Sequence, residues 1–252
     1  MARPISVQLY TLRDAAAKDY KKVLNDVAEI GYGYVELVGG YFGKTAAELR
    51  KDLDAVGLKA SGIYCGVLDP NQWKQVEDDA NALGVKFLTN GFGPESFDDE
   101  SKLKAAADKA NAAVAHFAPK GFSVCLHNHE FEFNRKLKFD ALLELAPKVC
   151  LETDIYWVKT GGVDPVGFVK KYADRVRLLH VKDGPADPKD RNLKMVAVGK
   201  GTVDIAGCLA AAEKGGVQYH VVELDWCATD MLTAVRESYQ FLTSKGLATG
   251  KK

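Results

Sequence analysis

Short apolar runs alternate with longer amphipathic stretches along the whole chain. Runs rich in β-branched and aromatic residues predict eight strands, at residues 5–11, 34–38, 60–65, 86–90, 122–129, 149–157, 176–182 and 219–225. Apolar positions at helical spacing predict helices at residues 18–30, 46–56, 72–83, 101–117, 139–146, 165–172, 205–214 and 231–242. Units of about thirty residues, each a strand followed by a helix, are typical of a closed (β/α)8 TIM barrel.

Glycines punctuate this pattern. Left-handed caps are expected where glycine follows a predicted helix, at Gly31, Gly57, Gly84, Gly215 and Gly246. The alternative architecture, an open doubly wound sheet, favours a Gly-rich phosphate turn after an early strand. The sequence contains neither GxGxxG nor GxxxxGK, and it shows no linker or low-complexity segment. We therefore expect one TIM-barrel domain over residues 1–252.

Composition narrows the classes of partner. The 34 basic and 34 acidic residues give no net charge, which disfavours binding to a nucleic-acid backbone. Five widely spaced cysteines without a CxxC pair indicate a reducing compartment, with neither disulfides nor a cysteine zinc site.

The apolar runs are too short to span a bilayer, so no membrane partner is expected. The segment MARPISVQLYTLRD lacks an apolar signal core, so we expect a cytoplasmic protein. The sequence is also compatible with an export signal removed upstream of Met1.

Candidate chemistry gathers at the ends of the last four predicted strands. Side chains alternate along a strand, so one face of each collects polar residues: His127 and His129, Glu152 and Asp154, His180 and Lys182, and Glu223 and Asp225. Active sites of TIM barrels form at the carboxyl ends of the strands. Such a cluster needs a compensating cation or an ion-pair network, because charges buried without partners are costly. A single divalent metal ion is the simplest answer, with Mn2+ favoured and Co2+, Zn2+, Fe2+ or Mg2+ also compatible.

Each candidate also has a structural interpretation. His116 and His220 are expected to be structural, and the alternative for His180 is a rim ion pair with Lys182 or Asp183. For Glu132, just beyond the fifth strand, a solvated loop carboxylate and a site role are equally favoured. Six further residues near strand ends could either contact substrate or fill the core or rim of the barrel: Tyr10, Glu36, Tyr64, Asn90, Glu152 and Asp183. Trp157 and Trp226 are expected to form apolar walls of a substrate pocket.

A resemblance follows from the order of several short motifs. The segments VQLYTLRD, GYVELVG, HNHEFEF, LETDIYWVKTGGVDP, LLHVKDG, VGKGTVD and VVELDW together resemble the sugar phosphate isomerase/epimerase family, whose members adopt the xylose isomerase-like barrel. The resemblance implies one divalent cation held by Glu, Asp, His and Glu from the last four strands. Asp154, His180 and Glu223 match three of these ligands. His127 stands where many relatives carry the first Glu, and Glu132 is the alternative fourth ligand.

The same resemblance implies the reaction. Two metal-bound carboxylates exchange a proton beside a carbonyl that the cation polarises. Here Glu223, His129 or Glu132 would move protons, and Lys182 would neutralise an oxyanion or orient a hydroxyl. We therefore expect an isomerase or epimerase of a small sugar or keto-sugar.

Two alternatives stay open beside this expectation. The less negative site created by His127 makes elimination equally reasonable, as in an inosose dehydratase or a 3-keto-glycoside lyase. The alternative from another class is a sugar-binding barrel without catalysis. A DNA-repair endonuclease on the same fold is disfavoured, because the chain has five histidines and no net charge. We expect an unphosphorylated carbohydrate as the partner, and a dimer or tetramer as the assembly.

Overall fold

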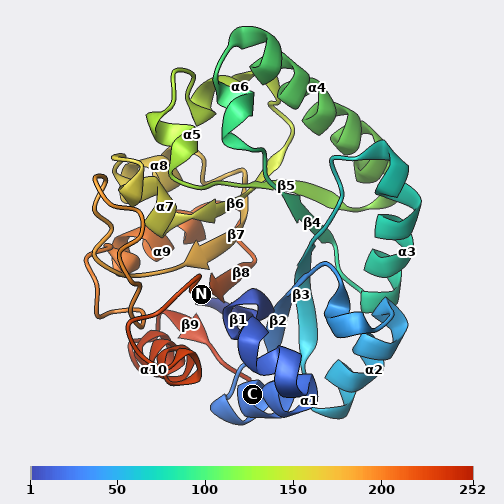
Figure 1. The fold of residues 1–252 in the computed structure, drawn as a ribbon, viewed down its shortest axis with the longest axis vertical. Coiled ribbons are helices and arrows are strands. Elements are labelled where there is room, and N and C mark those ends of the chain that lie inside the picture. Colours follow the sequence, from blue (N-terminus) through green and yellow to red (C-terminus); the bar gives the residue numbers. More distant parts are fainter. Residues whose placement is uncertain (1, 252) are drawn as a thin grey trace.

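The predicted strands close into a parallel barrel in the computed structural model, which describes residues 2–251 (Figure 1). The barrel strands follow one another in chain order: β1 (Arg3–Gln8), β2 (Tyr34–Val38), β3 (Lys59–Tyr64), β4 (Phe87–Asn90), β5 (Ser123–His127), β6 (Cys150–Asp154), β7 (Val176–Val181) and β8 (Tyr219–Val222). Val7 of β1 pairs with Val35 of β2 and with Val222 of β8, which closes the ring. The predicted (β/α)8 fold is confirmed.

Helices surround the ring of strands (Figure 1). The main ones are α1 (Arg13–Ile30), α2 (Ala46–Ala55), α3 (Trp73–Leu83), α4 (Glu100–Phe117), α6 (Phe139–Leu145), α8 (Pro165–Lys171), α9 (Ile205–Glu213) and α10 (Met231–Ser244). Outward-facing strand residues such as Val35, Leu126 and Val181 are fully buried against them. The main apolar core therefore lies between the barrel and its helices.

The barrel interior is unusually polar. The residues that alternate with this outer core are Gln8, Glu36, Thr89, Glu152 and His180, and each is buried. Ser6 and Ser61 share a hydrogen bond of 2.8 Å at the same inner side of β1 and β3. Hydrogen-bonding groups therefore occupy much of the barrel interior, beside inward-facing aliphatic side chains such as Leu178 and Val221.

Several strands end earlier than predicted. Residues 155–157, expected to extend the sixth strand, begin α7 (Ile155–Thr160). The physical reason is Asp154, whose Oδ1 accepts hydrogen bonds of 3.0 Å from the backbone N–H groups of Tyr156 and Trp157 and so caps the helix. Likewise, residues 9–12 form a short 3-10 helix after β1. The short elements α5 (Phe131–Asn134) and β9 (Ala248–Thr249) were not predicted.

The expected left-handed caps occur at Gly31, Gly57, Gly84 and Gly246, whose φ angles are positive. The prediction for Gly215 is wrong. A Cβ atom there would lie 1.9 Å from the carbonyl oxygen of Ala173, so glycine is required by close backbone packing instead. Within residues 2–251, no helix has the length and apolar character needed to cross a membrane.

Candidate active site

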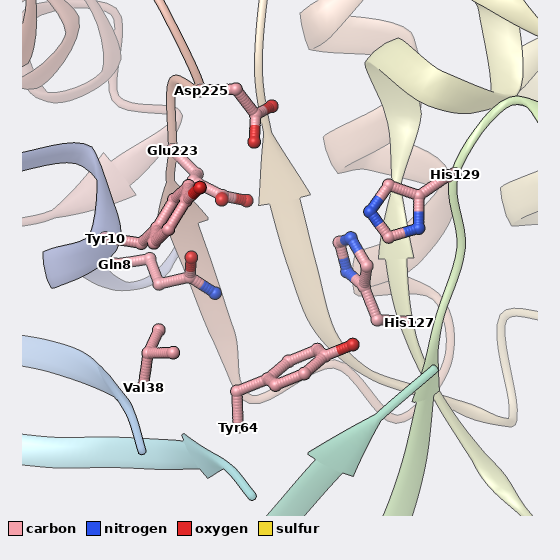
Figure 2. A pocket seen from close by; sticks show the side chains of 8 residues that line it. All are labelled: Gln8, Tyr10, Val38, Tyr64, His127, His129, Glu223 and Asp225. Atoms are coloured by element: carbon pink, nitrogen blue, oxygen red, sulfur yellow. The ribbon is translucent and has the colours of Figure 1, made fainter. Parts of the chain in front are cut away.

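A cavity of about 190 Å³ opens at the carboxyl ends of the strands. Its lining residues are Gln8, Tyr10, Val38, Tyr64, His127, His129, Glu223 and Asp225. Figure 2 shows Glu223 and Asp225 on one side of this cavity and the two histidine rings on the other. The cavity therefore has one carboxylate wall and one imidazole wall.

Four residues from four consecutive strand ends converge beside this cavity. His127, Asp154, His180 and Glu223 each place one donor atom so that all four atoms lie within 4.8 Å of one another. All four side chains are buried. Four of their atoms, one from each residue, lack a partner with hydrogen-bond geometry among the described residues: His127 Nδ1, Asp154 Oδ2, His180 Nδ1 and Glu223 Oε2. Two imidazoles and two carboxylates are a donor set that fits a first-row transition metal ion.

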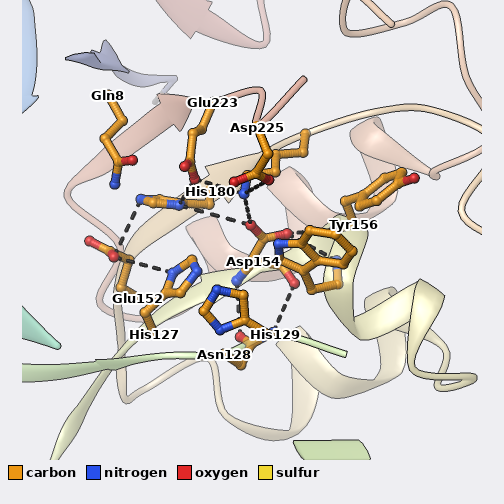
Figure 3. Close-up of polar contacts among 12 residues, drawn as sticks. Gln8, His127, Asn128, His129, Glu152, Asp154, Tyr156, His180, Glu223 and Asp225 are labelled. Carbon is orange, nitrogen blue, oxygen red and sulfur yellow. Dashed lines mark hydrogen bonds and ion pairs between the residues drawn. The ribbon is translucent and has the colours of Figure 1, made fainter. Parts of the chain in front are cut away.

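Asp154 is held so that only one of its oxygens faces the site. Its Oδ1 caps α7, which leaves Oδ2 directed at the cluster. The backbone of Asp154 is also fixed, because its N–H donates to Asn128 Oδ1 at 3.0 Å and its carbonyl accepts from Asn128 Nδ2 at 3.1 Å. Figure 3 shows these contacts between the ends of β5 and β6.

Lys182 supplies positive charge to the same cluster. Its Nζ lies 3.0 Å from Asp154 Oδ2, 2.9 Å from Glu223 Oε2 and 2.7 Å from Asp225 Oδ2. The side chain is 1% exposed, so these ion pairs operate with little solvent screening. The sequence predicted that the strand-end charges are compensated either by a bound cation or by an ion-pair network. The structure contains part of such a network.

The pKa values of these groups reflect burial and mutual charge. Burial would lower the pKa of Lys182, but Asp154, Asp225 and Glu223 raise it well above its ordinary value. Burial would raise the pKa of Glu223, but Lys182 and His180 hold it well below its ordinary range. Glu223 is therefore ionised and Lys182 protonated near neutral pH.

The histidines fall into two groups. Burial lowers the pKa of His127 well below its ordinary value and that of His129 to about 2, so both are neutral imidazoles. His180 differs, because the carboxylates of Glu152, Glu36 and Glu223 outweigh burial and raise its pKa well above the ordinary value. A metal ion that binds His180 must therefore displace a proton.

Glu36 and Glu152 lie inside the barrel and do not line the cavity. Glu36 Oε2 is 2.7 Å from His180 Nε2, and Glu152 Oε2 is 3.3 Å from His127 Nδ1. Burial, followed by the charge of Glu152, raises the pKa of Glu36 to about 8, while the contact with His180 acts in the opposite direction and favours the ionised carboxylate.

Other expected site residues contact the backbone instead of the cavity. Glu132 Oε2 accepts from the His129 N–H at 2.9 Å, and Glu132 is absent from the four-residue cluster. Asn90 bonds the carbonyl of Cys65 and the N–H of Gly91. Asp183 is buried and accepts hydrogen bonds from four backbone N–H groups: those of Gly184, Gly199, Gly201 and Val203. These contacts order the loops around the site.

Aromatic side chains close the rim of the site. Tyr10 and Tyr64, for which the sequence left both a substrate contact and a core or rim position open, line the cavity. Trp157 is buried, with Lys182 Nζ 5.4 Å and the Arg191 guanidinium 5.3 Å from its ring centroid. The Trp226 ring lies 6.1 Å from that of Trp157. The two tryptophans therefore pack beside each other next to the charged cluster.

Sequence reasoning missed some residues that the structure brings to the site. Gln8 and Val38 line the cavity at the ends of β1 and β2, where strand alternation alone could have indicated them. Arg191 comes from the loop after β7 and lies 3.2 Å from Glu130. No pattern in the sequence places a residue of such a loop.

Comparisons with known proteins agree with this fold. A family model described as "Xylose isomerase-like TIM barrel" matches residues 24–245. Two curated proteins named inosose dehydratase, from Geobacillus kaustophilus and Klebsiella pneumoniae, are 24% and 23% identical over 64% and 65% of this chain. The matches span 61% and 64% of those proteins.

A solved structure of a sugar phosphate isomerase/epimerase from Parabacteroides distasonis superposes with a TM-score of 0.82 at 24% identity. The superposition covers 99% of this chain and 96% of that one. At 24% identity this similarity shows that the two proteins share a fold, and it shows nothing further about function.

Proposed function

Because this chain belongs to the xylose isomerase-like TIM barrel family, we propose that it is a divalent-metal-dependent isomerase or epimerase of a small sugar or keto-sugar. The observation that carries the proposal is the convergence of His127, Asp154, His180 and Glu223 at the edge of a cavity. Membership of the family and the fold are compatible with an enzyme of this class, but the proposal of a specific reaction rests on these side chains.

The four clustered residues would hold the metal ion. Mixed nitrogen and oxygen donors favour Mn2+, and suit Co2+, Zn2+ or Fe2+ better than Mg2+. A bound ion would supply a Lewis acid that polarises a substrate carbonyl. Asp154 and His180 are fully buried, whereas His127 and Glu223 also line the cavity, and of these two only Glu223 is an anion. Glu223 is therefore the ligand best placed to act on substrate as well.

Glu223 would remove the proton beside the carbonyl. Its carboxylate is ionised because Lys182 and His180 hold its pKa low, and it faces the cavity from the carboxylate wall. Lys182 would stay protonated, but it is 1% exposed and does not line the cavity, so it would act through Glu223 and Asp225, whose negative charge it stabilises, and not by direct contact with substrate. On the opposite wall, the neutral His129 ring would bond a substrate hydroxyl.

The cavity volume of about 190 Å³ suits a monosaccharide or a cyclic polyol rather than a polymer. Both carboxylate and imidazole groups face it, so each wall offers partners for hydroxyl groups. The matches to proteins named inosose dehydratase also support a ketone derived from a carbohydrate.

A dehydratase or lyase is the second candidate, and one observation favours it. Carboxylates line only one wall of the cavity, since the position opposite Glu223 is taken by His127 and His129. Proton exchange between two faces of a substrate uses a base on each face, whereas elimination uses one base and a leaving group. The two curated relatives bear the name of a dehydratase.

Solvent exchange tests the proposal. The Mn2+-loaded protein is incubated in D2O with a panel of ketoses and with an inosose, and products are followed by NMR and mass spectrometry. We expect deuterium beside the carbonyl in a product of unchanged carbon skeleton and formula, and a loss of 10²-fold or more in Glu223→Gln. Glu237→Gln, a surface carboxylate paired with Lys200, is the matched control.

The products separate the candidate functions. A product lighter by one water identifies dehydration. Absence of both exchange and product with every ketone, from protein that carries its metal, contradicts both enzymatic candidates and favours the non-catalytic sugar-binding barrel.

A further inference from the structure

A second layer of carboxylates lies beneath the candidate metal ligands, inside the barrel. Glu36 comes from β2 and Glu152 from β6, and both are 0% exposed. Neither residue lines the cavity. They are therefore placed to act on the ligand histidines and not on substrate.

Glu36 holds His180 from below. Its Oε2 lies 2.7 Å from His180 Nε2, which is the distance of a charge-assisted hydrogen bond. Gln8 Nε2 donates to the same oxygen at 2.8 Å, which fixes the carboxylate. The other ring nitrogen, Nδ1, lies 2.7 Å from Glu223 Oε2 and 3.9 Å from Asp154 Oδ2. Glu36 thus contacts the nitrogen that points away from the cluster.

A carboxylate bonded to the remote nitrogen of a ligand histidine fixes the ring's tautomer and orientation and strengthens the ligand. We propose that Glu36 is a positioning residue that keeps the proton of His180 on Nε2 and so presents Nδ1 to the metal ion. This inference rests on the metal centre of the proposed function and deepens it. Gln8 supports Glu36 in the same role.

The two other roles of Glu36 that the geometry suggests are less favourable. Glu36, Glu152 and His180 could themselves form a cation site. However, Glu36 already forms a direct hydrogen bond with His180, and Glu36 does not line the cavity. A substrate contact, which the sequence left open, requires access that a fully buried carboxylate lacks.

Metal affinity and metal-free stability together test the role. Glu36→Gln is titrated with Mn2+ by calorimetry and by electron paramagnetic resonance, and its metal-free melting temperature is measured. We expect a dissociation constant 10- to 100-fold weaker than in the parent protein. The metal-free melting temperature should stay within about 4 °C, because the shape of the side chain is kept. Ser61→Ala, a buried polar change on β3 without a histidine contact, is the control and should bind Mn2+ as the parent does.

Glu36→Asp separates positioning from charge. Aspartate keeps the carboxyl group but is too short to reach His180 Nε2 in the same way. Positioning predicts weakened binding in this variant as well, whereas a purely electrostatic effect predicts parental affinity. Gln8→Ala removes no charge and should weaken binding in the same direction by a smaller factor, which keeps the test decisive if a Glu36 variant fails to fold.

Parental Mn2+ affinity in Glu36→Gln or in Glu36→Asp, or in Gln8→Ala where neither Glu36 variant folds, overturns the inference while the proposed function stands. Failure of the parent protein itself to bind Mn2+ or another divalent ion more tightly than Asp154→Asn overturns both.

Discussion

Asn128 and Asp154 are joined by a pair of reciprocal hydrogen bonds that link the end of β5 to the end of β6. The Asn128 side chain donates to the Asp154 carbonyl at 3.1 Å and accepts from the Asp154 N–H at 3.0 Å. His127 directly precedes Asn128, so this link sets the spacing between two candidate metal ligands. An amide that carries no charge and faces no substrate thereby controls the geometry of the site.

Asn128→Ala should damage both stability and the site. Two buried backbone groups of Asp154 lose their partners, which should lower the free energy of unfolding by about 2–4 kcal/mol. Urea denaturation measures this loss, and Mn2+ titration at a temperature where the variant is folded should show weaker binding. A variant with parental stability and metal affinity would contradict the role assigned to this link.

Lys182→Met should make the protein depend more strongly on metal. Removing the ammonium leaves Asp154, Glu223 and Asp225 close together with only His180 to offset their charge, which should cost about 3–5 kcal/mol in the metal-free state. A divalent ion neutralises the same oxygens, so the Mn2+-induced rise in melting temperature should be larger in the variant than in the parent. Lys200→Met, which removes an exposed pair with Glu237, is the control. An equal metal-induced shift in parent and variant would contradict this account.

The fold and the side of each strand that carries chemistry were predictable from the sequence. Alternation places His127, Asp154 and His180 on inward faces, and the structure puts them in one cluster. Alternation predicts which side of a strand a side chain occupies, but it does not predict how far along the barrel axis the side chain lies from the cavity. Glu36 and Glu152 share the inward face yet lie below the cavity, so sequence alone left a substrate contact open for both.

Capping and loop contacts explain most other differences. The prediction of strand through residue 157 failed because apolar periodicity cannot show that Asp154 caps a helix at that point. Asp183 looked like a rim residue, but its carboxylate organises the loop that returns from β7. Such contacts depend on backbone N–H groups that come together only after the chain has folded.

Asp183→Ala should release that loop. Four backbone N–H groups lose their common acceptor, which should cost about 3 kcal/mol or more. Trypsin should then cleave the exposed segment around Arg191 faster than in the parent protein. Asp187→Ala, an exposed change in the same loop, serves as the control. Parental cleavage rates in Asp183→Ala would show that the loop is held by other contacts.

His220 should make stability depend on pH. Burial lowers its pKa from an ordinary 6.5 to about 4, so the unfolded chain binds a proton first as the pH falls. This contribution to stability is complete above pH 6.5 and is lost as the pH falls from 6.5 towards 4, by up to about 3 kcal/mol. His220→Leu should therefore lose less stability than the parent between pH 7 and pH 4.5 in urea titrations. Parallel losses in both proteins would contradict the assignment.

Elemental analysis of the purified protein, repeated on Asp154→Asn after both are equilibrated with Mn2+ and desalted, tests the central claim most directly. The account predicts one divalent ion per chain in the parent protein and a substoichiometric amount in a folded variant. Equal metal content in the two proteins, or none in either, would show that these strand ends do not form a metal centre.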